Sequence, residues 1–181
     1  MASVLIRRDL ISQMIGAQFS ATSEPVSSFE PLELLLSRIS YGARQFEVDA
    51  AKRVGYQDYL EYQLAPEAID NTSLENAIAT SFKTLKMSAA EIFASNGPRS
   101  TMPFQAISEL RGATLLRQVY SPRQLYEVMV EFWSDHFSVQ HTDGLVQWLK
   151  TGDDLAIRKH AMGKFRDLLN DNARSPAMLF Y

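Results

Sequence analysis

The chain has 181 residues, 46% of them hydrophobic and 22% charged, which is the balance of a folded domain with a sizeable core. Its 18 basic and 21 acidic residues give a net charge of −3, which argues against a nucleic-acid partner because such a partner needs a basic face. The sequence contains no cysteine, and this excludes disulfides, thiolate nucleophiles and cysteine-bound metal centres.

The N-terminal part of the chain differs in character from the rest. Arg7 and Arg8 precede a mildly apolar stretch over residues 10–21, a pattern that weakly resembles a twin-arginine export signal. Polar residues interrupt the stretch, so an amphipathic arm is the alternative interpretation. We therefore predict an N-terminal arm or signal-like segment with its linker over residues 1–27, and a helical domain over residues 28–181. No apolar run reaches the roughly 20 residues that a transmembrane helix needs.

The first half of the domain has apolar residues at helical spacing, separated by turn residues. The expected helices cover about residues 28–41, 44–54, 56–64, 73–82 and 88–94. In the second of them, the spacing predicts a buried face with Phe46, Ala50 and Val54. Ser88 and Glu91 have the spacing of a capping box, which predicts the start of the last one.

A clear start signal lies in the second half of the domain. Pro103 suits the first turn of a helix that reaches Tyr120. Residues 121–124, with the sequence Ser-Pro-Arg-Gln, then combine an N-cap serine, a proline at N1 and a glutamine at N3. They predict that the next helix begins there and runs to about Val139.

The last helical region is expected after a turn at residues 141–144. Residues 151–154 have the composition of a helix cap, and the helical pattern continues to about residue 173 before Pro176 restarts the chain. No segment alternates with the period of a strand. The predicted fold is therefore all-α, an irregular multi-helix bundle without a significant sheet.

Four segments in a fixed order resemble one family. They are residues 35–42 (Leu-Leu-Ser-Arg-Ile-Ser-Tyr-Gly), 59–66, 132–137 (Phe-Trp-Ser-Asp-His-Phe) and 158–169, and the last leads to Ser-Pro-Ala-Met-Leu at 175–179. Over residues 32–181 the chain resembles the bacterial family catalogued as domain of unknown function eighteen hundred. The resemblance assigns no activity. It implies that the chain is the N-terminal part of a longer protein, and that an exported protein and a cytoplasmic one fit the sequence equally.

His136 is the residue of greatest chemical interest. It falls on a broad apolar helix face with Phe132 and Trp133, while a row of acidic residues lies opposite and is interpreted as a solvated face. We therefore predict that His136 faces the interior and finds a polar partner from residues 101–120 or 151–174. It is then either a core histidine or part of a polar site that faces a pocket.

Other polar residues have both a structural and a ligand-binding interpretation. Arg38, Arg111 and Arg117 lie in leucine-rich helices and are interpreted as structural ties, with an anionic substrate as the alternative. His136 and His141 are five residues apart, which does not suit two metal ligands on one helix face. We expect no metal and no cofactor.

These observations lead to three functional hypotheses. The first is a helical scaffold within a larger exported protein of unassigned activity, forming one wall of a site around Trp133, His136 and Arg117. The second is a hydrolase-type enzyme with most catalytic residues in a missing C-terminal part. The third is a protein-interaction module without catalysis. The expected partners are the remainder of a longer chain or another protein, and an exposed apolar patch is expected around Phe165 and residues 178–180.

Overall fold

The computed structural model describes residues 30–96, 102–140 and 146–181. Of these residues 80% are helical and none lies in a strand, which confirms the all-α prediction. The chain divides into the units Met1–Glu30 and Pro31–Tyr181, and all the described helices belong to the second unit. The predicted arm over residues 1–27 and the predicted turn at residues 141–144 lie outside the described residues.

Three short helices form the beginning of this unit, with a core of their own. They are α2 (Pro31–Ile39), α3 (Gln45–Val54) and α4 (Tyr56–Leu64). The buried members of this core are Leu35, Leu36, Ile39, Ala51 and Tyr59. Gly55 joins α3 to α4 with φ 88°, a left-handed conformation that a side chain would strain.

The predicted buried face of α3 was wrong by one residue. Ala51 is fully buried, whereas Phe46 and Val54 are exposed. Glu47 accounts for this rotation, because its carboxylate accepts from the backbone N–H of Arg44 at 2.7 Å and from the Arg44 guanidinium at 2.7 Å. This paired cap buries Glu47 on the same side as Ala51.

The chain continues through shorter elements. These are the 3₁₀ turn η1 (Pro66–Ala68), α5 (Thr72–Ser81), the 3₁₀ turn η2 (Thr84–Lys86) and α6 (Ala89–Asn96). The capping box at α6 forms as predicted. The backbone N–H of Ser88 donates to the Glu91 carboxylate at 2.7 Å, and the backbone N–H of Glu91 donates to the Ser88 hydroxyl at 3.2 Å.

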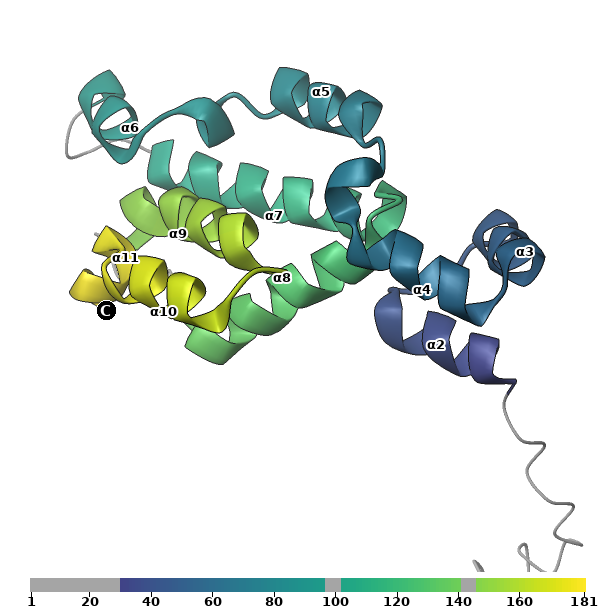
Figure 1. The fold of residues 1–181 in the computed structure, drawn as a ribbon. Coiled ribbons are helices and arrows are strands. Elements are labelled where there is room, and N and C mark those ends of the chain that lie inside the picture. Colours follow the sequence, from purple (N-terminus) through teal and green to yellow (C-terminus); the bar gives the residue numbers. More distant parts are fainter. Residues whose placement is uncertain (1–29, 97–101, 141–145) are drawn as a thin grey trace, which may run out of the picture. The chain divides into compact units, whose positions relative to one another are not determined.

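Three long helices lie side by side in the second half of the unit (Figure 1). They are α7 (Met102–Tyr120), α8 (Gln124–Phe137) and α9 (Val146–His160), and each contacts the other two. The short helices α10 (Phe165–Ala173) and α11 (Pro176–Phe180) pack against α9. This arrangement leaves one face of each long helix turned toward the other two.

The start of α8 differs from the prediction. The N-cap residue is Arg123, and the buried Ser121 hydroxyl accepts from the Arg123 backbone N–H at 3.1 Å instead of capping the helix. Gln124 explains the shift, because its side-chain amide donates to the carbonyls of Gln118 at 3.0 Å and Ser121 at 2.8 Å. The segment therefore satisfies carbonyl groups at the C-terminal end of α7 and does not cap the start of α8.

The predicted cap at residues 151–154 was also wrong, since these residues lie inside α9. The buried Asp153 carboxylate accepts from Lys150 Nζ at 2.6 Å and from Asn172 Nδ2 at 3.3 Å. Its oxygens are thus used by side chains of α9 and α10. A cap would need them for the free backbone N–H groups of a helix start.

Candidate pocket between three helices

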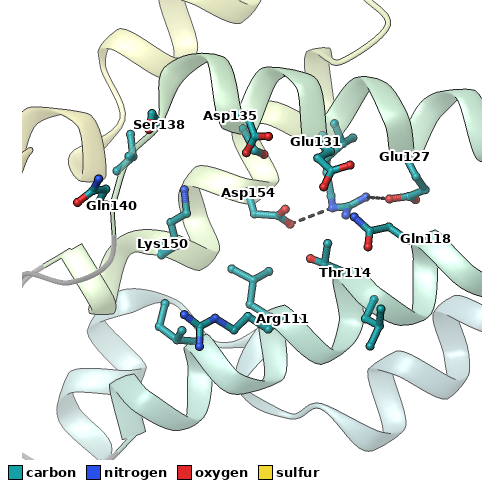
Figure 2. A pocket seen from close by; sticks show the side chains of 17 residues that line it. Arg111, Thr114, Gln118, Glu127, Glu131, Asp135, Ser138, Gln140, Lys150 and Asp154 are labelled. Carbon is teal, nitrogen blue, oxygen red and sulfur yellow. Dashed lines mark hydrogen bonds and ion pairs between the residues drawn. The ribbon is translucent and has the colours of Figure 1, made fainter. Parts of the chain in front are cut away.

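The helices α7, α8 and α9 enclose a pocket of about 430 Å³, shown in Figure 2. Its volume falls within the range of small-molecule sites, roughly 300–1,000 Å³. Arg111, Thr114 and Gln118 come from α7, and Lys150 and Asp154 come from α9. The α8 wall is acidic. Glu127, Glu131 and Asp135 recur there at four-residue spacing, which places them on one side of a helix.

Arg158 of α9 is the central group of the lining. Its Nη1 donates to the Glu127 carboxylate at 2.9 Å, and its Nε donates to the Asp154 carboxylate at 2.9 Å. The dashed lines in Figure 2 mark these two contacts. The side chains of Arg158 and Glu127 are 10% and 3% exposed, so this ion pair between α8 and α9 is buried.

Burial and charge shift the protonation equilibria of this network. Burial raises the pKa of the Glu127 carboxyl above its ordinary value, and the nearby Arg158 limits the rise. Burial by itself would lower the pKa of Arg158, but Asp154 and Glu127 outweigh it and raise that pKa. Arg158 therefore stays charged, and a buried carboxyl with a raised pKa lies in a cleft, as is common at functional sites.

Two kinds of polar group in the lining are not fully paired within the described ranges. Arg158 Nη2 is buried and has no hydrogen-bond partner among the described residues, although Nε and Nη1 are paired. Glu131 and Asp135 are exposed, and neither forms an ion pair with any residue in the described ranges. Glu131 lies near Tyr41, whose pKa is raised by burial and by this carboxylate.

Arg117, one of the three predicted site residues, lies outside the pocket. Its Nε and Nη2 donate to the two carboxylate oxygens of Glu75 on α5, at 2.9 Å and 2.7 Å. This fork-shaped contact is the structural tie that the sequence predicted for it. The hydrogen bond from Arg117 lowers the pKa of Glu75. Of the other arginines considered as ties, Arg38 is exposed and Arg111 lines the pocket.

Trp133 and His136 lie on another side of α8, also outside the pocket lining. Trp133 Nε1 donates to the Ala161 carbonyl at 3.0 Å, and its ring packs against Phe165 with ring centroids 5.6 Å apart. His136 is exposed and has ring contacts with Phe132, Trp133 and Phe137 but no hydrogen bond within the described residues.

The prediction that His136 faces the interior was therefore wrong, and helix geometry gives the reason. Each residue turns an α-helix by about 100°, so His136 lies about 180° from Glu127, nine residues earlier. Glu127 is buried against Arg158, which turns the His136 side of α8 away from the pocket. The structure does not bring His136, Trp133 and Arg117 together in one site.

The chemistry of the described lining is that of binding groups. Within the described ranges, no three His, Asp or Glu residues are grouped so that they could hold a metal ion. Ser134 lines the pocket, but the described lining residues include no histidine that would act as its base. The lining instead combines four carboxylates with three cationic side chains, together with the hydroxyl and amide groups of Thr114 and Gln118.

Sequence reasoning missed Arg158, Asp154 and Glu127 as members of a site. A signal existed for the first two, because an acid and an arginine four residues apart pair on one helix face. The interpretation of residues 151–154 as a cap placed the helix start at these residues. The pairing of Asp154 with Arg158 inside the helix was therefore not predicted. Glu127 gave no comparable signal, because its burial depends on α9 lying across it.

Fold and pocket define the class of protein: an all-helical protein with a charged pocket between three long helices. Residues 34–181 match the model of the family described as "Protein of unknown function (DUF1800)", and the chain belongs to this family. No curated protein and no solved structure matches the chain. In the part of the chain that the structure describes, no helix is long and apolar enough to cross a membrane.

Proposed function

We propose that the helical unit is a binding scaffold and that the pocket between α7, α8 and α9 holds a small polar molecule. The observation that carries this proposal is the Arg158 network at the pocket. Two carboxylates from two helices hold a buried guanidinium in place, while its Nη2 group has no acceptor in the described part of the chain. Buried polar groups are costly unless they are hydrogen-bonded, so a buried N–H group without an acceptor beside an open pocket favours a ligand site.

The lining supports the proposal in a second way. Its charged groups come from three helices that pack against one another, which fixes their geometry before a ligand arrives. Lys150 is held by Asp153, and Arg158 is held by Glu127 and Asp154. A preorganised lining lowers the entropic cost of binding.

Filling the pocket tests this function. Thr114 is half-buried and points into the pocket from α7, so Thr114→Phe should occupy the space that a ligand needs. Ser108→Phe is the matched control, because Ser108 lies on the same helix but is exposed and outside the lining. The 181-residue protein and both variants are screened against a library of small polar metabolites by saturation-transfer NMR.

We expect compounds that bind the unmodified protein and the Ser108→Phe variant but lose their signal with Thr114→Phe. Circular dichroism verifies that both variants keep their helical content. Compounds that bind all three proteins alike would place binding elsewhere. A library in which nothing binds the unmodified protein would contradict the proposed function.

A second candidate function, a protein-interaction module, is favoured by the aromatic side of α8. Phe132 is 52% exposed and Phe165 of α10 is 51% exposed, and both rings contact Trp133. Exposed apolar groups in such a cluster are typical of protein-binding surfaces. We infer that further polypeptide of a larger protein covers this surface, as the scaffold hypothesis requires.

Oxidative footprinting can test this second candidate. Hydroxyl radicals should modify Phe132 and Phe165 readily in the 181-residue chain. In the product of the whole reading frame, in its native host, the same two rings should be protected several-fold, while exposed Tyr56 of α4 serves as an internal reference. Equal modification in both samples would rule out a cover on this surface.

Export is part of the same proposal and rests on Arg7 and Arg8 with the apolar stretch that follows them. Replacing both arginines by lysine keeps the charge but removes the twin-arginine pattern. In cell fractionation, we expect the native protein outside the cytoplasm and the Arg7→Lys, Arg8→Lys variant inside it. Retention of both forms in the cytoplasm would contradict export.

A further inference from the structure

Among the described residues, two acids of the α8 wall have no ion-pair partner, whereas Glu127 is paired with Arg158. Four carboxylates and three cationic side chains line the pocket, and Lys150 and Arg158 are already paired within the protein. Glu131 and Asp135 are four residues apart and exposed, and neither has an ion-pair partner in the described part of the chain. Like charges at this spacing repel each other, and a ligand cation would relieve the repulsion.

A second and independent feature of the pocket favours a hydrogen-bond acceptor in the ligand. The Arg158 side chain is nine-tenths buried and its Nη2 needs a hydrogen-bond acceptor. Glu127 and Asp154 already offset the charge of this guanidinium, so the acceptor can be a neutral oxygen. Nη2 itself is buried, so an oxygen reaches it only when a neighbouring side chain of the lining moves aside.

We propose that the ligand of this pocket carries an ammonium group beside a neutral oxygen acceptor. The ammonium group pairs with Glu131 and Asp135, and the oxygen accepts from Arg158. This inference rests on the proposed function and names the chemistry of its ligand. Two kinds of molecule present these groups: an amino sugar, with its hydroxyl oxygens, and a short peptide, with its first carbonyl oxygen. Both fit a pocket of about 430 Å³.

The electrostatics disfavour the alternative of an anionic ligand. A carboxylate or phosphate in the pocket would lie among Glu127, Glu131, Asp135 and Asp154. Lys150 and Arg158 already neutralise protein carboxylates, and Arg111 is engaged in an interaction of its own. An added anion would therefore meet net repulsion in a partly desolvated space, where charges interact more strongly than in water.

Titration of the 181-residue protein with matched probes tests the inference. The probes are glucosamine and alanyl-alanine amide, each compared by NMR titration with its N-acetylated form, which keeps the oxygens but loses the positive charge. We expect at least one of the two amines to bind, and its acetylated form to bind about tenfold more weakly or not at all. Tighter binding of glucosamine would identify the ligand as an amino sugar, and tighter binding of alanyl-alanine amide would identify it as a peptide.

A charge-removing variant then assigns the contact. Glu131→Gln combined with Asp135→Asn keeps the size of both side chains, and it should weaken amine binding about tenfold. Asp167→Asn, an exposed acid of α10 outside the pocket, is the matched control and should leave binding unchanged. Unfolding curves of the variants verify that they fold like the unmodified protein.

Three results would overturn the inference: acetylated probes that bind as well as the amines, an unaffected double variant, or tight binding of acetate instead. If neither amine binds but other compounds bind in a manner that Thr114→Phe abolishes, the ligand class is wrong and the proposed function stands. If no compound binds at all, the proposed function itself fails.

Discussion

The two sides of α8 differ in which of their residues are buried. The side with Glu127, Glu131 and Asp135 faces the pocket, and Glu127 is 3% exposed. The side with Phe132 and His136 is open, although its residues are aromatic. A soluble helix normally buries its apolar stripe and exposes its acids. Glu131 and Asp135 follow this rule because they are exposed, whereas Glu127 departs from it through its buried ion pair with Arg158 of α9.

This comparison also separates two kinds of stabilisation along one helix. On the pocket side, a buried ion pair joins α8 to α9. On the aromatic side, Trp133 and Met129 pack around a small core of Val130, Ile157 and Ala161. Substitutions on the two sides should therefore differ in size and in mechanism.

The largest effect is expected at Arg158. Arg158→Met removes the cation and leaves Glu127 and Asp154 as carboxylates without a partner, one of them deeply buried. Breaking a buried pair in this way costs about 3–5 kcal/mol. Urea unfolding should show this loss in the free energy of unfolding.

The double variant Arg158→Met, Glu127→Gln supplies the control, because it removes the buried charge as well. It should regain part of the lost stability. A loss below about 1 kcal/mol in the single variant would mean that the ion pair does not hold α8 in place.

A smaller effect is expected at Trp133 on the aromatic side. Trp133→Ala should cost about 2–3 kcal/mol, less than for a fully buried aromatic because this ring is only half-buried. Trp133→Phe keeps most of the packing but loses the hydrogen bond to the Ala161 carbonyl, at a cost of about 1 kcal/mol. Thermal unfolding of the two variants should give these effects in this order, and the reverse order would contradict the packing described.

The Arg117–Glu75 tie provides an ion pair outside α8 for comparison. Glu75 is 42% exposed, so solvent screens the pair, and Glu75→Gln should cost only about 0.5–1 kcal/mol at neutral pH. Arg117 lowers the pKa of Glu75 in the folded state. The stabilisation is therefore present above the pKa of an unfolded glutamate, about 4.3, and is lost as the pH falls through the lower folded value. Unfolding curves between pH 7 and pH 3 should show the two proteins converge in acid.

The smallest effect is expected at His136. His136→Ala removes an exposed ring that makes only aromatic contacts, so the free energy of unfolding should change by less than about 0.5 kcal/mol. Ligand binding in the pocket should also be unaffected, because His136 is not in its lining. A loss comparable to that of Trp133→Ala would show that His136 has a partner on the aromatic side.

Much of the fold could be read from local pattern. The positions of α2, α4, α6 and α7 follow from apolar spacing and from capping residues such as Ser88 and Glu91. These signals act within one helical turn, so they need no tertiary context. Predictions failed where a polar side chain bonds to another helix or to a neighbouring side chain, as Gln124 and Asp153 do.

The candidate site could not be predicted in the same way. The sequence predicted a site at His136 and Trp133, because a histidine within an apolar helix face predicts a buried polar group. The pocket instead forms around Arg158, which is 31 residues from its partner Glu127. No local pattern encodes such a contact, since its energy depends on removing both groups from water.

The sequence by itself determined the helical class of this protein, most of its helix positions and its family. Each of these follows from short-range periodicity, from capping or from the order of the segments that resemble the family. Only the tertiary structure decided which side of each helix faces inward. Glu127 belongs to the acidic row of α8, and only the packing of α9 buries it against Arg158. The reason is that burying a charged side chain is too costly unless the fold also brings its ion-pair partner into contact with it.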